Sequence, residues 1–71
     1  MLNRVREIRK RKGLTQKELA VSAHIGQVTI SNIETERYVP RVDVALSIAA
    51  VLETTVEELF IIKRGPYNER R

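Results

Sequence analysis

The sequence has no cysteine and no tryptophan, and its aromatic side chains are limited to one phenylalanine and two tyrosines. Without cysteine the chain can form neither a disulfide nor a thiolate metal site, so the redox state of its compartment does not matter. Apolar runs such as residues 59–62 are far shorter than the roughly 20 residues of a membrane-spanning helix. The N-terminus also lacks the apolar core of a signal peptide. We therefore expect a single cytoplasmic domain with a small core.

Groups suited to catalysis are equally scarce. The one histidine, His24, has a single carboxylate, Glu18, close to it along the chain, so helical spacing assembles neither a catalytic triad nor a metal cluster. The three glycines form no phosphate-binding loop, and the aromatic residues are too few to line a ligand pocket. We expect no catalytic activity, no cofactor and no metal ion, and we interpret His24 as a turn residue.

The formal net charge of +4 is distributed unevenly. Residues 1–13 carry six bases against one acid, for +5, and residues 63–71 carry four bases against one acid, for +3. The segment between them, residues 14–62, holds three bases against seven acids and is at −4. A polyanion would therefore meet selected edges of the molecule rather than a uniformly basic surface. Two alternatives for the basic N-terminal run are a solvated helix face and a helix lying on a membrane surface.

Residues 14–34 have the pattern of two short amphipathic helices joined by a tight turn. Thr15, followed three residues later by Glu18, forms a capping box and predicts a helix over residues 16–23. The small apolar residues of this helix share one face, where a second helix can approach closely; they are Leu19, Ala20 and Ala23.

The second helix of this segment is predicted over residues 27–34, with Gly26 at its N-terminus and Ile30 and Ile33 pointing inward. Its outer face is polar but uncharged, with Gln27, Val28, Thr29, Ser31 and Asn32 on or near it. Glutamine and asparagine amides can form paired hydrogen bonds with the adenine edge, whereas a face of lysine and arginine would bind phosphate without discrimination. This composition favours recognition of base edges. An alternative for Val28 is a place in the core.

The rest of the chain is also predicted to be helical, over residues 2–12, 42–52 and 56–61, and no strand-like alternation persists. Gly13 is suited to end the first helix, and Thr55 begins a second capping box. The residues expected to face the core from these helices are Leu2, Val5, Ile8, Val44, Ala45, Ile48, Ala49, Leu52, Val56, Leu59 and Phe60.

Several strings of residues match one known family. They are Ile8-Arg9, Gly13 to Ala20, Ile33-Glu34, Pro40 to Leu52 and Thr55 to Phe60. In this combination the chain resembles the helix-turn-helix family of phage Cro and repressor proteins and their bacterial relatives, the XRE-type regulators. The resemblance implies an all-α fold: a compact five-helix lambda-repressor-like DNA-binding domain over residues 1–62, with the motif at its second and third helices. Residues 63–71 would then be a basic, flexible tail.

The resemblance also implies roles for individual residues. Base contacts are expected from the outer face of the third helix, at Gln27, Val28, Thr29 and Asn32. Phosphate contacts are expected at Gln16, Arg11, Lys12, Ser31, Arg37 and Arg41. Arg9 and Glu34 match a pair that forms an internal salt bridge in several relatives. The hydroxyl and amide groups have a second interpretation as solvated surface.

Three positions depart from the family pattern, which commonly has glycine there: His24, Glu36 and Glu53. Histidine tolerates a positive φ better than most residues with a side chain, whereas glutamate does not. We therefore expect a left-handed conformation at His24 and local rebuilding of the turns at Glu36 and Glu53. Keeping the left-handed geometry would cost on the order of 1 kcal/mol at each glutamate.

Together these features predict a repressor-like transcriptional regulator that binds double-stranded DNA as a homodimer, with its third helix in the major groove. The dimer contact is expected at Leu59, Phe60, Ile61 and Ile62, because this segment has more apolar surface than its own helix can bury. The alternative is an antitoxin-like or co-regulator module that uses the same fold and patch to bind a partner protein. No membrane partner is expected, since Gly13 and the capped helix after it indicate that the first helix packs internally.

Overall fold

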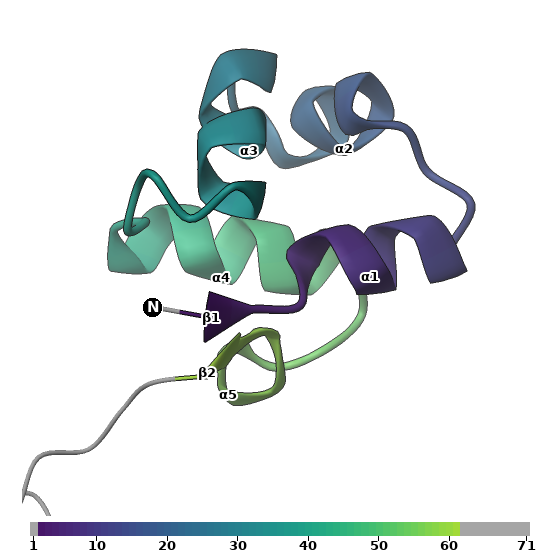
Figure 1. The fold of residues 1–71 in the computed structure, drawn as a ribbon. Coiled ribbons are helices and arrows are strands. Elements are labelled where there is room, and N and C mark those ends of the chain that lie inside the picture. The colour runs from purple at the N-terminus through teal and green to yellow at the C-terminus, as the bar shows by residue number, and fades with distance from the viewer. Residues whose placement is uncertain (1, 62–71) are drawn as a thin grey trace, which may run out of the picture.

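The computed structural model describes residues 2–61. Within them, five helices and one short pair of strands follow one another in the order β1 (Leu2–Asn3), α1 (Val5–Arg11), α2 (Gln16–Ala23), α3 (Gln27–Glu34), α4 (Val42–Val51), α5 (Val56–Leu59) and β2 (Phe60–Ile61) (Figure 1). The fold class is all-α, as predicted, and α2 and α3 have the predicted bounds. Residue 62 and the predicted tail over residues 63–71 lie outside the described residues.

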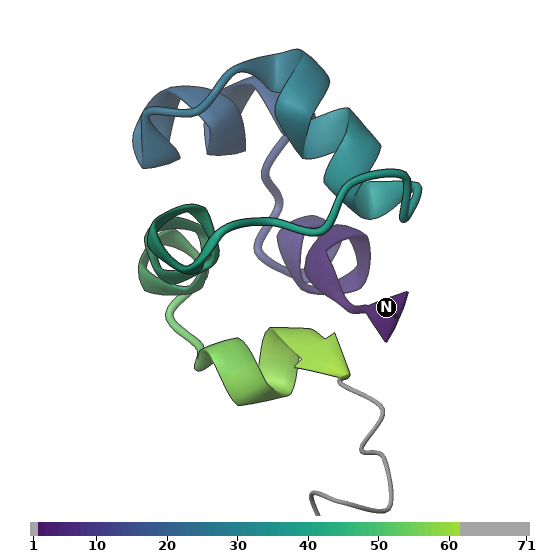
Figure 2. The ribbon, with the colours of Figure 1, turned by 90° about the vertical axis from the view of Figure 1, so that its left-hand side faces the viewer.

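Figures 1 and 2 show α2 and α3 on one side of the molecule and α5 on the opposite side, with α1 and α4 between them. The core lies where these helices meet, and α2 packs against both α3 and α4. It consists of Val5, Leu19, Ala20, Ile30, Ile33, Ala45, Ile48, Ala49, Leu52, Leu59 and Phe60. Ile8, Val44 and Val56 are half-buried against it, so the residues predicted to face the core are confirmed apart from Leu2, whose side chain lies outside the described part of the structure.

The prediction of a helix over residues 2–12 is wrong at its N-terminal end. Residues Leu2–Asn3 instead form an antiparallel pair with Phe60–Ile61, and α1 begins at Val5. The side chain of Asn3 accepts a hydrogen bond of 3.1 Å from the Val5 N–H, which satisfies a donor that the first turn of α1 leaves free. The last predicted helix likewise ends early, at Leu59, because the chain there becomes extended and pairs with β1.

The expectation that Leu59 and Phe60 offer surface to a partner is also wrong. The two residues are 0% and 3% exposed, because their side chains fill the core of their own chain. The side chain of Ile61 and all of Ile62 lie outside the described part of the structure. Val5 of α1 is buried as well, so the apolar side of α1 is not available to lie on a membrane. None of the described helices is long and apolar enough to cross one.

Both predicted capping boxes are present. The Thr15 hydroxyl accepts a bond from the Glu18 N–H at 3.0 Å, and the Glu18 carboxylate accepts one from the Thr15 N–H at 2.8 Å. Thr55 and Glu58 form the same pair of bonds at the start of α5. The Thr54 hydroxyl and the Thr55 N–H both donate to Glu58 and hold the pKa of its carboxyl below the usual range. These bonds fix where α2 and α5 begin.

Four helices, α1 to α4, are followed by a residue in the left-handed conformation. The φ angles are +75° at Gly13, +59° at His24, +65° at Glu36 and +58° at Glu53. The expectation for His24 is confirmed, but the predicted rebuilding at Glu36 and Glu53 is wrong. Both glutamates keep the geometry that glycine would adopt.

Hydrogen bonds at the helix ends explain why the glutamates are tolerated. After α3, the N–H of Glu36 donates to the Ile33 carbonyl at 3.0 Å, and the N–H of Arg37 donates to the Asn32 carbonyl at 2.8 Å. The same two-bond arrangement follows α4, through the N–H groups of Glu53 and Thr54. Each arrangement satisfies carbonyls that a helix end otherwise leaves unpaired, which offsets the steric cost of a positive φ.

This account predicts that Glu36→Gly stabilises the protein. Removing the Cβ relieves the left-handed strain, and the greater freedom of glycine in the unfolded chain offsets part of the gain, so we expect up to about 1 kcal/mol. Glu36→Ala is the matched control, because it removes the same charge but keeps the Cβ. Urea denaturation should give a higher free energy of unfolding for the glycine variant than for the alanine variant. Equal values for the two would contradict the presence of strain.

Candidate nucleic-acid interface

A buried ion pair joins α1 to the end of α3. The Nε of Arg9 lies 2.7 Å from Oε2 of Glu34, and its Nη2 donates to Oε1 at 3.2 Å. The third donor position of Arg9, Nη1, donates to the Leu14 carbonyl at 2.7 Å. Only 9% of the Arg9 side chain and 2% of the Glu34 side chain are exposed. The pair expected between these residues is therefore present, in a site that largely excludes water.

Glu34 also holds the first turn of α2. The side-chain amide of Gln16 donates from Nε2 to Oε1 of Glu34 at 3.1 Å. A further bond of 2.8 Å runs from Nδ2 of Asn3 to the carbonyl of Ile33 and ties the N-terminal segment to α3. Sequence reasoning missed Asn3, although an asparagine just before the first turn of a helix is a common capping signal. These contacts fix the C-terminal half of α3 against α1 and α2.

The outer face of α3 is polar, uncharged and accessible. Ile30 and Ile33 are fully buried, whereas Gln27 is exposed and Val28 is 74% exposed, so Val28 does not belong to the core. The other three expected contact residues on this helix, Thr29, Ser31 and Asn32, are partly exposed. A convex helix with these groups can present amides, hydroxyls and one pair of methyl groups to a partner surface.

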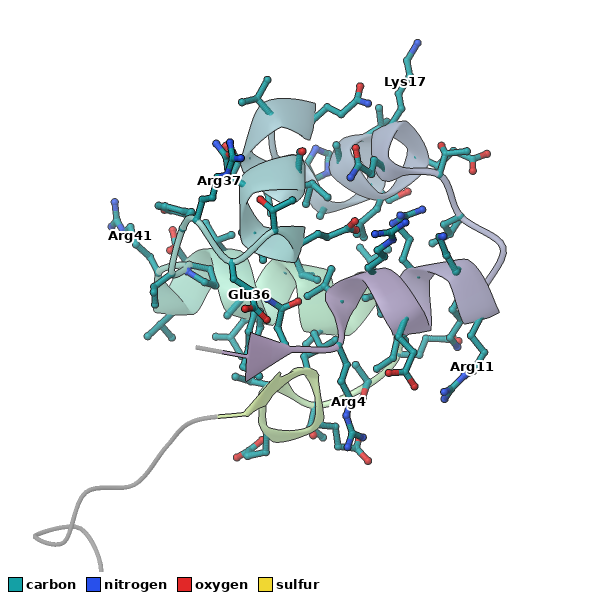
Figure 3. The ribbon with its side chains drawn as sticks, viewed as in Figure 1. Arg4, Arg11, Lys17, Glu36, Arg37 and Arg41 are labelled. Atoms are coloured by element: carbon teal, nitrogen blue, oxygen red, sulfur yellow. The ribbon has the colours of Figure 1, made fainter. Side chains whose placement is uncertain are left out.

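Exposed basic side chains lie around this face. Figure 3 shows Lys17 projecting from α2, and Arg37 and Arg41 projecting from the segment between α3 and α4. Arg41 lies 3.7 Å from Asp43, but both side chains are largely exposed, and a surface pair of this kind contributes little to stability. Sequence reasoning did not select Lys17. Its position in the first turn of a capped helix, next to Gln16, was the available signal.

The structure does not bring Arg11 and Lys12 together with these residues. Arg11 pairs with Glu7 at 2.7 Å, and in Figure 3 it points away from α2 and α3, as Arg4 does. Lys12 donates to Glu53 at 2.7 Å, and this hydrogen bond and its charge hold the pKa of the Glu53 carboxyl below its usual range. Phosphate contacts by Arg11 and Lys12 stay a prediction.

The arrangement of these groups suits the binding of a nucleic acid. Within residues 2–61 there is no group of three or more acidic, histidine or cysteine side chains that could hold a metal ion. The polar outer face of α3 can form hydrogen bonds with base edges, and donors on α2 and after α3 can meet phosphates on either side.

A helix-turn-helix family model matches residues 5–59 of the chain. Two proteins of Archaeoglobus fulgidus, each described as an uncharacterized HTH-type transcriptional regulator, are related to it. One is 39% identical over 61 residues, which are 86% of this chain and 87% of that protein. The other is 32% identical over 71 residues and spans both chains completely.

Solved structures show the same fold. The N-terminal DNA-binding domain of SinR from Bacillus subtilis superposes with a TM-score of 0.77 at 30% identity, over 87% of this chain and 91% of that one. A chain of the SinR–SinI protein complex gives a TM-score of 0.78 at 28% identity, over 94% of this chain and 69% of that one.

The ion pair yields a prediction about stability. Glu34→Gln leaves the Arg9 charge buried without a counter-charge, so we expect the free energy of unfolding to fall by about 3 kcal/mol. Glu7→Gln is the control, because it breaks an exposed pair with Arg11 of the same bond length and should cost less than about 1 kcal/mol. Denaturant unfolding of both variants measures the difference. Similar losses would show that burial of the Arg9–Glu34 pair has no energetic consequence.

Proposed function

Because this chain belongs to the helix-turn-helix family of Cro and phage-repressor (XRE-type) regulators, we propose that it binds specific DNA sequences with α3 in the major groove. Membership of the family makes the chain a DNA-binding transcriptional regulator. The finer proposal concerns sequence selection, the residues that achieve it and the state in which the protein binds.

The observation that carries this proposal is the uncharged, exposed face of α3. Gln27 and Asn32 have amides that can bond the N6 and N7 positions of adenine in pairs, and the exposed methyl groups of Val28 suit the thymine methyl. Thr29 adds a hydroxyl at the edge of this face. A face without charge gains little from phosphate attraction, so its binding energy depends on which bases it meets.

Phosphate contacts are proposed from the groups that surround α3. Gln16 stands in the first turn of α2, where free backbone N–H groups and the helix dipole favour an anion. Its amide uses one N–H for Glu34 and keeps the second for a phosphate oxygen. Ser31 is partly exposed on α3 itself, and Arg37 and Arg41 project from the segment after α3. Arg41 also suits the adjoining minor groove. Lys17 is added to the proposed phosphate contacts because it projects from α2 in Figure 3.

The protein is proposed to bind as a homodimer. Two copies with their α3 helices about 34 Å apart would enter successive major grooves on one side of the duplex. A dimer seated in this way covers its site against other proteins, which supports repressor-like action. Its place of action would be the cytoplasm, with the DNA.

A second candidate function is the binding of a partner protein, in an antitoxin-like or co-regulator role. The support is that SinR, which has the same fold, has been solved in a complex with the SinI protein. Exposed apolar side chains outside α3, among them Val42 and Leu46, offer a surface for such a contact. This function is compatible with DNA binding.

Selection from a pool of random duplexes at near-physiological salt tests the main proposal. Low salt is avoided, because phosphate attraction alone then enriches any DNA. A motif with two-fold symmetry is the expected result and would give the half-site spacing directly. Absence of any motif above background would contradict sequence-specific binding and favour the partner-protein function.

Two substitutions should separate base contacts from phosphate contacts. Gln27→Ala is expected to lose about 1–3 kcal/mol on the selected site with little change on random DNA. Arg37→Ala should weaken binding to the selected site and to random DNA alike. It should also lower the slope of log affinity against log salt concentration by about 1. Arg4→Ala is the charge-matched control for Arg37, since Arg4 points away from α2 and α3. Titration by fluorescence anisotropy at several salt concentrations measures these effects; equal losses for the two arginine variants would contradict the proposed phosphate contact.

A further inference from the structure

The outer face of α4 carries an apolar stripe that no segment within residues 2–61 covers. Val42 is 75% exposed, Leu46 is 55% exposed, and Ala50 is also exposed. Residues spaced by four lie on one face of a helix, so these three form a single row. The adjoining side of α4 supplies the core residues Ala45, Ile48 and Ala49. We refer to Val42, Leu46 and Ala50 as the α4 stripe.

Two shallow surface depressions share Leu46, at the middle of the α4 stripe. One is lined by Arg41, Val42, Asp43 and Leu46. The other also has Leu46 in its lining and extends past Ala50 to Val56 and Glu57, at the start of α5. The stripe therefore lies between an arginine at one end and a glutamate at the other, with Leu46 at its centre.

We propose that the α4 stripe is the surface through which two copies of this chain pair, with their α4 helices antiparallel about a two-fold axis at Leu46. The inference rests on the proposed function, since it names the contact of the homodimer. It replaces the contact expected at Leu59 and Phe60, which the core of each copy occupies.

An antiparallel pair would place apolar side chains opposite one another and bring opposite charges together at its ends. In an antiparallel pair, Leu46 meets Leu46 of the second copy, and Val42 meets the hollow beside Ala50 and Val56. The same rotation brings Arg41 of each copy toward Glu57 of the other, so opposite charges face each other at both ends of the contact. Asp43 stays with its own chain, where its carboxylate accepts the Val44 N–H and lies near Arg41.

The position and size of the stripe fit a dimer that forms together with DNA binding. Its N-terminal end adjoins the segment that carries Arg37 and Arg41, the proposed phosphate contacts (Figure 3). A single pair of short helices buries less than the roughly 800 Å² per partner of a standard interface. Pairing in solution is therefore weak, and binding of both copies to neighbouring half-sites strengthens it.

Sedimentation of the full chain without DNA tests this surface. The wild-type chain should show a monomer–dimer equilibrium, and Leu46→Asp should raise the dimer dissociation constant at least about tenfold, because each copy would place a charge in an apolar contact. Val21→Asp is the matched control: Val21 is an exposed apolar residue on α2, and its substitution should leave dimerisation unchanged. Circular dichroism verifies that both variants are folded.

A wild-type chain that stays monomeric up to about 1 mM, or a Leu46→Asp variant that pairs as well as the control, would overturn the proposal. Cross-linking covers the case in which Leu46→Asp fails to fold. Since the chain has no cysteine, Leu46→Cys supplies a single thiol, which should give a disulfide-linked dimer on mild oxidation. Val21→Cys should not; equal yields from the two variants would also overturn the proposal.

DNA binding distinguishes a failure of this inference from a failure of the proposed function. On duplexes that carry one selected half-site, the Leu46→Asp variant should bind with the same affinity as the wild type. On duplexes with two half-sites, the variant should lose the gain in affinity that the wild type obtains when two copies bind side by side. Undiminished cooperativity in this variant would place the dimer contact elsewhere while leaving sequence-specific binding intact. Failure to select any site would contradict the proposed function, and the sedimentation and cross-linking results would still decide whether the α4 stripe pairs.

Discussion

The buried pair between Arg9 and Glu34 is the contact on which the arrangement of the first three helices depends. Removing two charges from water costs several kcal/mol for each ion, and only nearly complete hydrogen bonding offsets this cost. Glu34 accepts bonds from Arg9 and from Gln16, and Arg9 also donates to the Leu14 carbonyl. A shift of α3 relative to α1 or α2 would leave a buried charge unpaired. The network therefore resists such shifts and keeps the outer face of α3 in a fixed orientation.

Short helices need such external support. The first four helices have 7 to 10 residues each, fewer than the roughly 12–15 that an isolated helix needs to be stable in water. Their stability comes from packing and from their ends, and all four ends use a left-handed residue that lets two N–H groups return to the last turn. Glutamate at two of these positions shows that the hydrogen bonds outweigh the preference for glycine there.

Local signals in the sequence predicted most of the fold. Capping boxes and apolar spacing gave the bounds of α2 and α3, and the family resemblance gave the Arg9–Glu34 pair. Apart from the turns at Glu36 and Glu53, the failures concern contacts between distant residues. Pairing of residues 2–3 with residues 60–61 leaves no periodic pattern, so the first helix was predicted to begin too early. Lys12 finds its carboxylate partner 41 residues away, at Glu53, and apolar spacing alone does not show that Leu59 and Phe60 turn into the core.

The energy available from one copy of α3 explains why pairing matters to the proposed function. An amide that bonds an adenine edge discriminates by about 1–3 kcal/mol, so Gln27 and Asn32 together supply about 2–6 kcal/mol. Specific sites are typically bound about 4–10 kcal/mol more tightly than random DNA. The discrimination by one copy reaches only the lower part of this range of about 4–10 kcal/mol. Two copies on neighbouring half-sites double the discrimination, which then spans the range. The contact between copies need not be strong for this, because a bound copy holds the second at a high local concentration. A narrow apolar stripe on α4 is then sufficient, and it leaves the polar face of α3 free for the bases.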